Sequence, residues 1–114
     1  MHSCVFCKIV SGEIPSPMLG ESEHAVAFAD IHPAAPVHAL VIPRKHMAAF
    51  AEANVQDATI LGDLMLLAAR VARELGLERS GYRLVSNTGE DAGQSVAHLH
   101  VHVLGGRKLA WPPG

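Results

Sequence analysis

The sequence predicts an α+β domain in which one short and one long helix accompany a five-stranded antiparallel sheet. Three observations support this fold class: five segments have strand-like patterns, two have helical spacing, and most connections are short turns. The 114 residues are enough for one domain with a hydrophobic core but too few for two. We therefore expect a single domain over residues 1–114.

Composition excludes several classes of protein. A hydrophobic content of 49% excludes a disordered chain, and a net charge of -2 does not provide the basic field that a nucleic-acid polymer requires. A small nucleotide remains compatible, because a few local donors can hold one phosphate. No basic segment leads into an apolar one at the N-terminus, and the most apolar stretch, residues 61–75, carries four charged side chains. We expect neither a secretory signal nor a membrane span, and the two closely spaced cysteines favour a cytoplasmic protein.

The N-terminal half predicts one helix and three strands. Apolar residues at helical spacing predict a short helix over residues 4–10, which Ser11-Gly12 ends. Two prolines, Pro15 and Pro17, then require an extended connection. The expected strands are residues 18–21, 25–30 and 37–43. Proline spacing makes residues 31–36 a loop, and the β-rich composition of the third strand predicts a central position in the sheet.

A long helix follows in the second half. Asn54 is a plausible N-cap, and Gly76 stands where a left-handed C-cap belongs. The residues at helical spacing between them are apolar: Leu61, Leu64, Ala68, Val71, Ala72 and Leu75. Three more apolar residues, Ile60, Leu66 and Leu67, widen this face. Two explanations are open: burial by a partner subunit, or a position deep between other elements of the same domain.

The last strand, residues 98–104, alternates three histidines with apolar residues. A strand over residues 82–86 and a loop of small and donor residues over 87–95 lead into it, and no regular structure is expected over residues 108–114. Side chains two apart share one face of a strand and lie roughly 6.6 Å apart. We therefore expect the imidazoles of His98, His100 and His102 to form a row, backed by three apolar side chains in the core.

The histidine row is compatible with two chemistries. In the first, the central His100 is a nucleophile for phosphoryl or nucleotidyl transfer, and His38 faces the row from a neighbouring strand. The preceding loop then supplies what a phosphate needs: backbone access at Gly93 and donors on Asn87, Gln94 and Ser95. In the second chemistry, the imidazoles hold a zinc ion with an open catalytic position.

The triad segment resembles the histidine triad (HIT) family, and further motifs resemble its Hint branch. These motifs run over nearly the whole chain in the expected order: 6–9, 12–15, 28–31, 35–38, 41–46, 93–95, 98–107 and 111–114. The resemblance implies a HIT-like fold and a homodimer in which two five-stranded sheets join into one ten-stranded sheet, with the long helices at the interface. It further implies hydrolysis of purine nucleoside phosphoramidates or related nucleoside monophosphate derivatives, with AMP or GMP as the nucleotide part.

The resemblance also implies roles for individual residues. His100 would form a nucleotidyl-histidine intermediate without a catalytic cofactor, and His102 would hold the α-phosphate together with Asn87, Gly93 and Ser95. Asp30 would accept hydrogen bonds from the ribose hydroxyls. Apolar residues would flank the base, namely Val5, Phe6, Ile9, Phe28 and Ile31. The alternative from another class is a nucleotide-binding regulatory protein whose hydrolysis is incidental.

Three features depart from the family pattern, and one of them is Cys4-x-x-Cys7, which only part of the branch has. Ala97, directly before the triad, is small where the family usually has a bulkier residue, which suggests a roomier leaving-group side. His24 and His32 match no motif, and we expect both on the surface.

Cys4 and Cys7 have the spacing of a zinc knuckle, which needs two further ligands. A redox pair or two small core-facing residues are the alternatives. The distantly related galactose-1-phosphate uridylyltransferases pair a Cys-x-x-Cys with a later histidine and with the first histidine of the catalytic strand. By this analogy, we expect Cys4, Cys7, His46 and His98 to form one tetrahedral zinc site. Because protein would fill all four positions, the metal would be structural.

Overall fold

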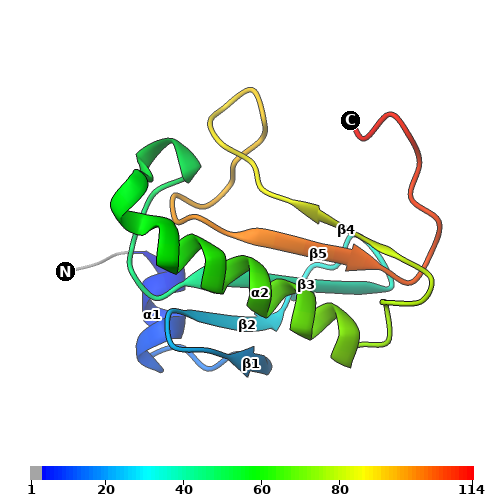
Figure 1. Cartoon of the computed structure of the whole chain (residues 1–114), viewed down its shortest axis with the longest axis horizontal. Coiled ribbons are helices and arrows are strands. Elements are labelled where there is room, and N and C mark those ends of the chain that lie inside the picture. Colours follow the sequence, from blue (N-terminus) through cyan, green and yellow to red (C-terminus); the bar gives the residue numbers. More distant parts are fainter. Residues whose placement is uncertain (1–3) are drawn as a thin grey trace.

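Five antiparallel strands form one sheet in the computed structural model, which describes residues 4–114 (Figure 1). The strands are β1 (Met18–Glu21), β2 (Ala25–Ala29), β3 (Val37–Pro43), β4 (Tyr82–Val85) and β5 (Val101–Gly105). Their order in the sheet is β1-β2-β3-β5-β4. The predicted α+β class and the central position of β3 are therefore confirmed.

Each face of the sheet is covered by one helix. The long helix α2 (Ala58–Glu74) packs on the face that carries Ala27, Val41, Val101 and Val103, and the sheet and helix share one hydrophobic cluster. The opposite face carries a smaller cluster, to which the short helix α1 (Val5–Ser11) contributes Phe6. Because both faces are covered, the first four residues of β2 are buried without alternation.

Helix α2 begins later than its N-cap signal alone predicts. Asn54 caps a 3₁₀ turn, η2 (Val55–Asp57), with a capping box that Asp57 closes by accepting from the Asn54 amide. The α-helix continues from this turn and ends at Glu74. Gly76 has a φ of 79°, and the Leu77 amide donates to the Ala72 carbonyl, which is the expected left-handed C-terminal motif.

Only part of the widened apolar face of α2 is covered within the domain. Leu67 is buried together with Leu64, Ala68, Val71 and Ala72, whereas Leu66 is 72% exposed and Met65 is 39% exposed.

No helix in the part of the chain that the structure describes is long and apolar enough to cross a membrane.

The histidine strand is shorter than predicted, because β5 begins at Val101 and not at His98. The register pairs Val101 with Val41, which places Leu99 opposite Pro43. Pro43 has no N–H to continue the ladder, and the Leu99 amide donates instead to the Met47 carbonyl at 2.6 Å. The segment 98–100 therefore lies between β5 and the loop after β3, outside the ladder.

Smaller differences occur at other element ends. Strand β2 ends at Ala29 because the Asp30 carboxylate accepts from the His32 amide and turns the chain. Strand β4 ends at Val85, and the Ser86 hydroxyl donates to the His100 carbonyl. Cys4 is the N-cap of α1, which therefore spans one position later than predicted.

Candidate active site and metal cluster

A cavity of about 530 Å³ lies beside α1 on the face of the sheet that carries Phe28 and Leu40. This volume is in the range of small-molecule sites. Most of the lining is apolar: Val5, Phe6, Ile9, Ile14, Pro15, Pro17, Phe28, Ala29, Ile31, Leu40 and Val96. The polar residues of the lining are Ser16, Asp30, His32, His38, Ser95, His100 and His102. The cavity therefore offers an apolar surface for a ring and polar side chains for a charged or hydrogen-bonding group.

His100 is held in one tautomer by a backbone carbonyl. Its Nδ1 lies 2.7 Å from the carbonyl oxygen of His98, and because a carbonyl only accepts, Nδ1 carries the proton. The lone pair is therefore on Nε2. The ring is 3% exposed and contacts Phe6 edge to face at a centroid distance of 5.2 Å. The ring is thus held in the orientation and in the tautomer that a nucleophilic Nε2 needs.

A second chain of hydrogen bonds fixes the tautomer of His102. The Ala34 amide donates to Nδ1 of His38 at 2.9 Å, which places the His38 proton on Nε2. Nε2 of His38 lies 2.9 Å from Nδ1 of His102 and 3.3 Å from a carboxylate oxygen of Asp30. With Nδ1 of His102 accepting, its Nε2 carries a proton. His102 is therefore a hydrogen-bond donor beside the lone pair of His100, with ring centroids 5.0 Å apart.

Burial keeps both supporting imidazoles neutral. It is the largest cause that lowers the pKa of His102 to about 4, and the neighbouring His100 and His38 act in the same direction. Burial also lowers the pKa of His38, although the Asp30 carboxylate opposes this shift. At neutral pH the His102 ring is therefore an uncharged donor.

The lowered pKa of His102 predicts a loss of stability in acid. An unfolded histidine has a pKa of about 6.5, so between roughly pH 6.5 and 4 the unfolded chain binds more protons than the folded chain. The stabilisation from neutral His102 is present above this window and is lost as the pH falls through it. We expect the free energy of unfolding, measured with urea, to fall less between about pH 7 and pH 5 in His102→Gln than in the wild type. Equal losses in the two proteins would contradict the assignment.

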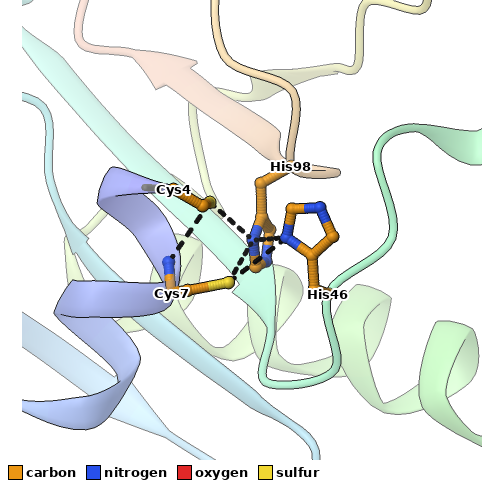
Figure 2. Close-up of side chains that lie close together, drawn as sticks. All are labelled: Cys4, Cys7, His46 and His98. Atoms are coloured by element: carbon orange, nitrogen blue, oxygen red, sulfur yellow. Dashed lines mark hydrogen bonds between the residues drawn. The ribbon is translucent and has the colours of Figure 1, made fainter. Parts of the chain in front are cut away.

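A separate cluster of Cys4, Cys7, His46 and His98 lies at the N-terminal end of α1 (Figure 2). One ligand atom from each residue lies within 4.8 Å of the others. Nδ1 of His98 is 3.4 Å from Sγ of Cys4, 3.6 Å from Sγ of Cys7 and 3.1 Å from Nδ1 of His46. The edges of a tetrahedral zinc site with Zn–S and Zn–N bonds are roughly 3.3–3.8 Å. The four predicted ligands therefore meet at the spacing of a metal site.

The hydrogen bonds of the imidazoles separate this cluster from a second group. Nε2 of His98 donates to the Pro43 carbonyl at 2.9 Å, which leaves the Nδ1 lone pair toward the cysteines. Asp30, His38 and His102 also lie within 4.8 Å of one another. There, a metal on Nε2 of His38 would need a proton on Nδ1, where the Ala34 amide already donates. The first cluster fits a metal ion, whereas this hydrogen bond disfavours a metal ion in the group of Asp30, His38 and His102.

The cavity brings together most of the residues that the sequence singles out, but not all. His38, Ser95, His100 and His102 line it, as do Asp30 and the apolar base-flanking set. His98 is fully buried in the cluster and contributes its backbone carbonyl to His100. Asn87, Gly93 and Gln94 lie outside the lining.

The side chain of Gln94 contacts backbone. Its amide oxygen accepts from the Gly89 amide, and its Nε2 donates to the carbonyls of Ala48 and Val96. Gln94 thus connects the loop before the triad with the loop after β3. This connection places the neighbouring Ser95 in the cavity.

Sequence reasoning misses several groups of the site. His32, expected on the surface, is exposed and at the same time lines the cavity together with Ser16. The sequence offers one signal for the position of His32, which is that it follows Asp30 by two residues. At this spacing an aspartate carboxylate can accept from the backbone amide, as Asp30 does from that of His32. The backbone groups of His98 and Ala34 leave no signal in the sequence.

Comparisons with known proteins agree with this geometry. Residues 11–109 match the family described as HIT domain. An uncharacterized HIT-like protein of Synechococcus elongatus is 48% identical over 110 residues, which are 96% of each chain. A solved HIT family hydrolase from Legionella pneumophila superposes with a TM-score of 0.95 at 46% identity, over 98% of this chain and 100% of that chain. A histidine triad nucleotide-binding protein from Candida albicans gives 0.83 at 34% identity, over 96% of this chain and 83% of that chain. With its triad and its five-stranded sheet, the chain belongs to the HIT family.

Proposed function

We propose that the chain is a nucleotide hydrolase that cleaves purine nucleoside phosphoramidates, or related derivatives of AMP or GMP, through a nucleotidyl-histidine intermediate on His100. The observation that carries this proposal is the hydrogen bond from Nδ1 of His100 to the His98 carbonyl, which in the neutral ring leaves the lone pair on Nε2. The name of the Legionella relative, a hydrolase, and that of the Candida relative, a nucleotide-binding protein, support the class of reaction and ligand.

In the first step, Nε2 of His100 attacks the α-phosphorus, and the bond from phosphorus to the leaving group breaks. The imidazole becomes positively charged as it forms the new P–N bond, and the His98 carbonyl stabilises this charge by accepting from Nδ1. Nε2 of His102 donates to a phosphate oxygen that gains negative charge. Ser95 is proposed to lie toward the leaving group, which takes up a proton from solvent as it departs.

In the second step, a water molecule attacks the same phosphorus, and the bond from phosphorus to Nε2 of His100 breaks. The nucleoside monophosphate is released, the proton of the water goes to solvent, and His100 returns to its neutral form. The two steps together split one difficult displacement into two easier ones. Asp30 is proposed to accept from the ribose hydroxyls, since its carboxylate lines the cavity. The apolar set that includes Phe6, Ile9 and Phe28 is proposed to flank the base. Asn87 and Gly93 remain predictions from the resemblance as phosphate contacts.

We further propose that the four-residue cluster holds a structural zinc ion. The donor set of two thiolates and two imidazoles is typical of structural zinc, and the hydrogen bond from Nε2 of His98 to the Pro43 carbonyl, which orients the ring, supports it. When bound, the ion would fill its four positions with protein ligands and would supply rigidity. No catalytic cofactor is needed for the two steps above.

Turnover of adenosine 5′-monophosphoramidate tests the proposed reaction. We expect release of AMP and ammonia, and a nucleotidyl adduct in the intact mass spectrum after an alkaline quench, because phosphoramidates on histidine are labile in acid. AMP binding is measured in parallel by calorimetry. Intact AMP binding with near-zero turnover would favour the alternative, a nucleotide-binding regulatory protein with incidental hydrolysis.

We also propose a homodimer with α2 at the interface. Leu66 and Met65 are exposed on this helix, and burial of such side chains is favourable. We expect the mass of a dimer at micromolar concentration and a monomer for Leu66→Glu, both measured by light scattering. Val55→Glu is the matched control, because Val55 is 88% exposed but lies before α2. A monomeric wild type would refute the dimer.

A further inference from the structure

Helix α1 serves the cavity and the cysteine cluster at the same time. Cys4 and Cys7, at its N-cap and first turn, belong to the cluster, whereas Val5, Phe6 and Ile9 line the cavity. A helix of seven residues is not stable by itself in water, so its position depends on the contacts that it makes with the rest of the domain. A change in the contacts that Cys4 and Cys7 make in the cluster is therefore able to move the α1 side chains that line the cavity.

Phe6 is the side chain of α1 that contacts both sites. Its ring is 7% exposed and packs edge to face against His98, with a centroid distance of 5.9 Å, and against His100, at 5.2 Å. It packs in the same manner against Phe28 of the cavity wall, at 5.6 Å. One ring thus contacts a cluster ligand, the proposed nucleophile and the proposed base site.

The segment 98–100 provides a second connection. It lies outside the β5 ladder, and the His98 side chain is one of its attachments to the rest of the domain. The carbonyl of the same residue fixes the tautomer of His100. Figure 2 shows the side chains of Cys4 and Cys7 from α1 beside that of His98. Two walls of the cavity are therefore attached to the cluster, one through α1 and one through this segment.

We propose that occupation of the Cys4–Cys7–His46–His98 cluster by a divalent cation of the zinc type sets the nucleotide affinity of the cavity, and that Phe6 is the positioning residue that couples the two sites. This inference rests on the proposed function. A cation held by both α1 and His98 restricts the positions of Phe6, so the nucleotide meets a wall that is already ordered. By linkage, a bound nucleotide must raise the affinity for the cation by the same factor.

Binding of AMP to zinc-loaded and chelator-stripped protein tests the coupling without any turnover. We expect the Kd for AMP, measured by calorimetry, to be on the order of tenfold lower in the loaded protein. Competition with a chromophoric chelator measures the zinc affinity with and without saturating AMP, and we expect the same factor. Equal Kd values for AMP in the two forms would overturn the coupling and leave nucleotide binding intact.

Variants of Phe6 test its role as the connection. Phe6→Leu retains an apolar side chain but loses the ring contacts, and we expect the ratio of the two Kd values to approach one while zinc still binds. A simple packing role would instead weaken AMP binding equally in both forms and leave the ratio unchanged. Val10→Ala is the matched control, because Val10 packs in the same hydrophobic cluster as Phe6 but does not line the cavity. The ratio of the two Kd values in this variant is expected to equal that of the wild type.

The remaining outcomes also decide the question. A full ratio in Phe6→Leu would overturn the role of Phe6. Absence of AMP binding in both forms would overturn the coupling together with the proposed function, and absence of zinc binding would overturn the coupling alone.

Discussion

His100→Ala is expected to lower kcat/KM for adenosine 5′-monophosphoramidate by about 10⁴-fold or more, since it removes the nucleophile on which both steps depend. The ring of His100 packs against Phe6 and His102 at the cavity, so its removal leaves the main core under α2 unchanged. Steady-state turnover measures the loss, and circular dichroism with a thermal melt checks the fold. The nucleotidyl adduct is expected in the wild type and absent in the variant.

A histidine outside the cavity provides the control for this variant. His24 lies in the turn between β1 and β2, where its backbone amide donates to the carboxylate of Asp63 on α2. His24 is not part of the cavity lining. His24→Ala is therefore expected to retain the turnover and the adduct. If His100→Ala instead retained most of its rate, the nucleophile assignment would be wrong, and the metal-based alternative would again need to be considered.

Removal of the metal is expected to lower the thermal stability of the protein by a large amount. A ligand that binds only the folded chain stabilises it by about 4 kcal/mol at a thousandfold excess over Kd, which corresponds to a change in Tm on the order of 10 °C in a domain of this size. We expect about one zinc per chain by elemental analysis of protein purified without chelator. Addition of a strong chelator should then lower the Tm by this amount.

The double variant Cys4→Ser/Cys7→Ser tests which residues are responsible. It is expected to contain no zinc, to melt at the temperature of the stripped wild type, and to show no response to the chelator. Ser11→Ala is the control, because Ser11 lies on the same helix but bonds only within it and to the following turn. A zinc content far below one per chain, or an unchanged Tm in the double variant, would count against the metal site.

The order and type of the elements could be predicted because they depend on local patterns. The β-rich composition of residues 37–43 predicts a strand with the observed bounds, and the strand expected over residues 18–21 also has them. Gly76 ends the long helix because the left-handed conformation has a low cost for glycine. The four cluster ligands are predicted by analogy with another family and not by any local rule.

The boundary of the histidine strand could not be predicted from its own alternation. Residues 98–104 have one uninterrupted pattern, yet the ladder ends at the pair of Val41 and Val101, before the register would bring Pro43 opposite Leu99. A strand needs a partner with free backbone groups, and the identity of that partner is a property of the sheet. For the same reason Gln94, expected at a phosphate, binds backbone groups of two loops that come together only in the folded chain.

The sequence by itself determined which side chains are available: three alternating histidines, a Cys-x-x-Cys, and the apolar residues of one sheet and two helices. The tertiary structure decided what each histidine does. His98 faces two cysteines, His100 donates to a carbonyl, and His102 accepts from His38. These roles depend on which ring nitrogen carries the proton, and that is set by partners such as the carbonyls of Pro43 and His98. Because these partners are far apart in the chain or are backbone atoms, only the folded structure determines the roles.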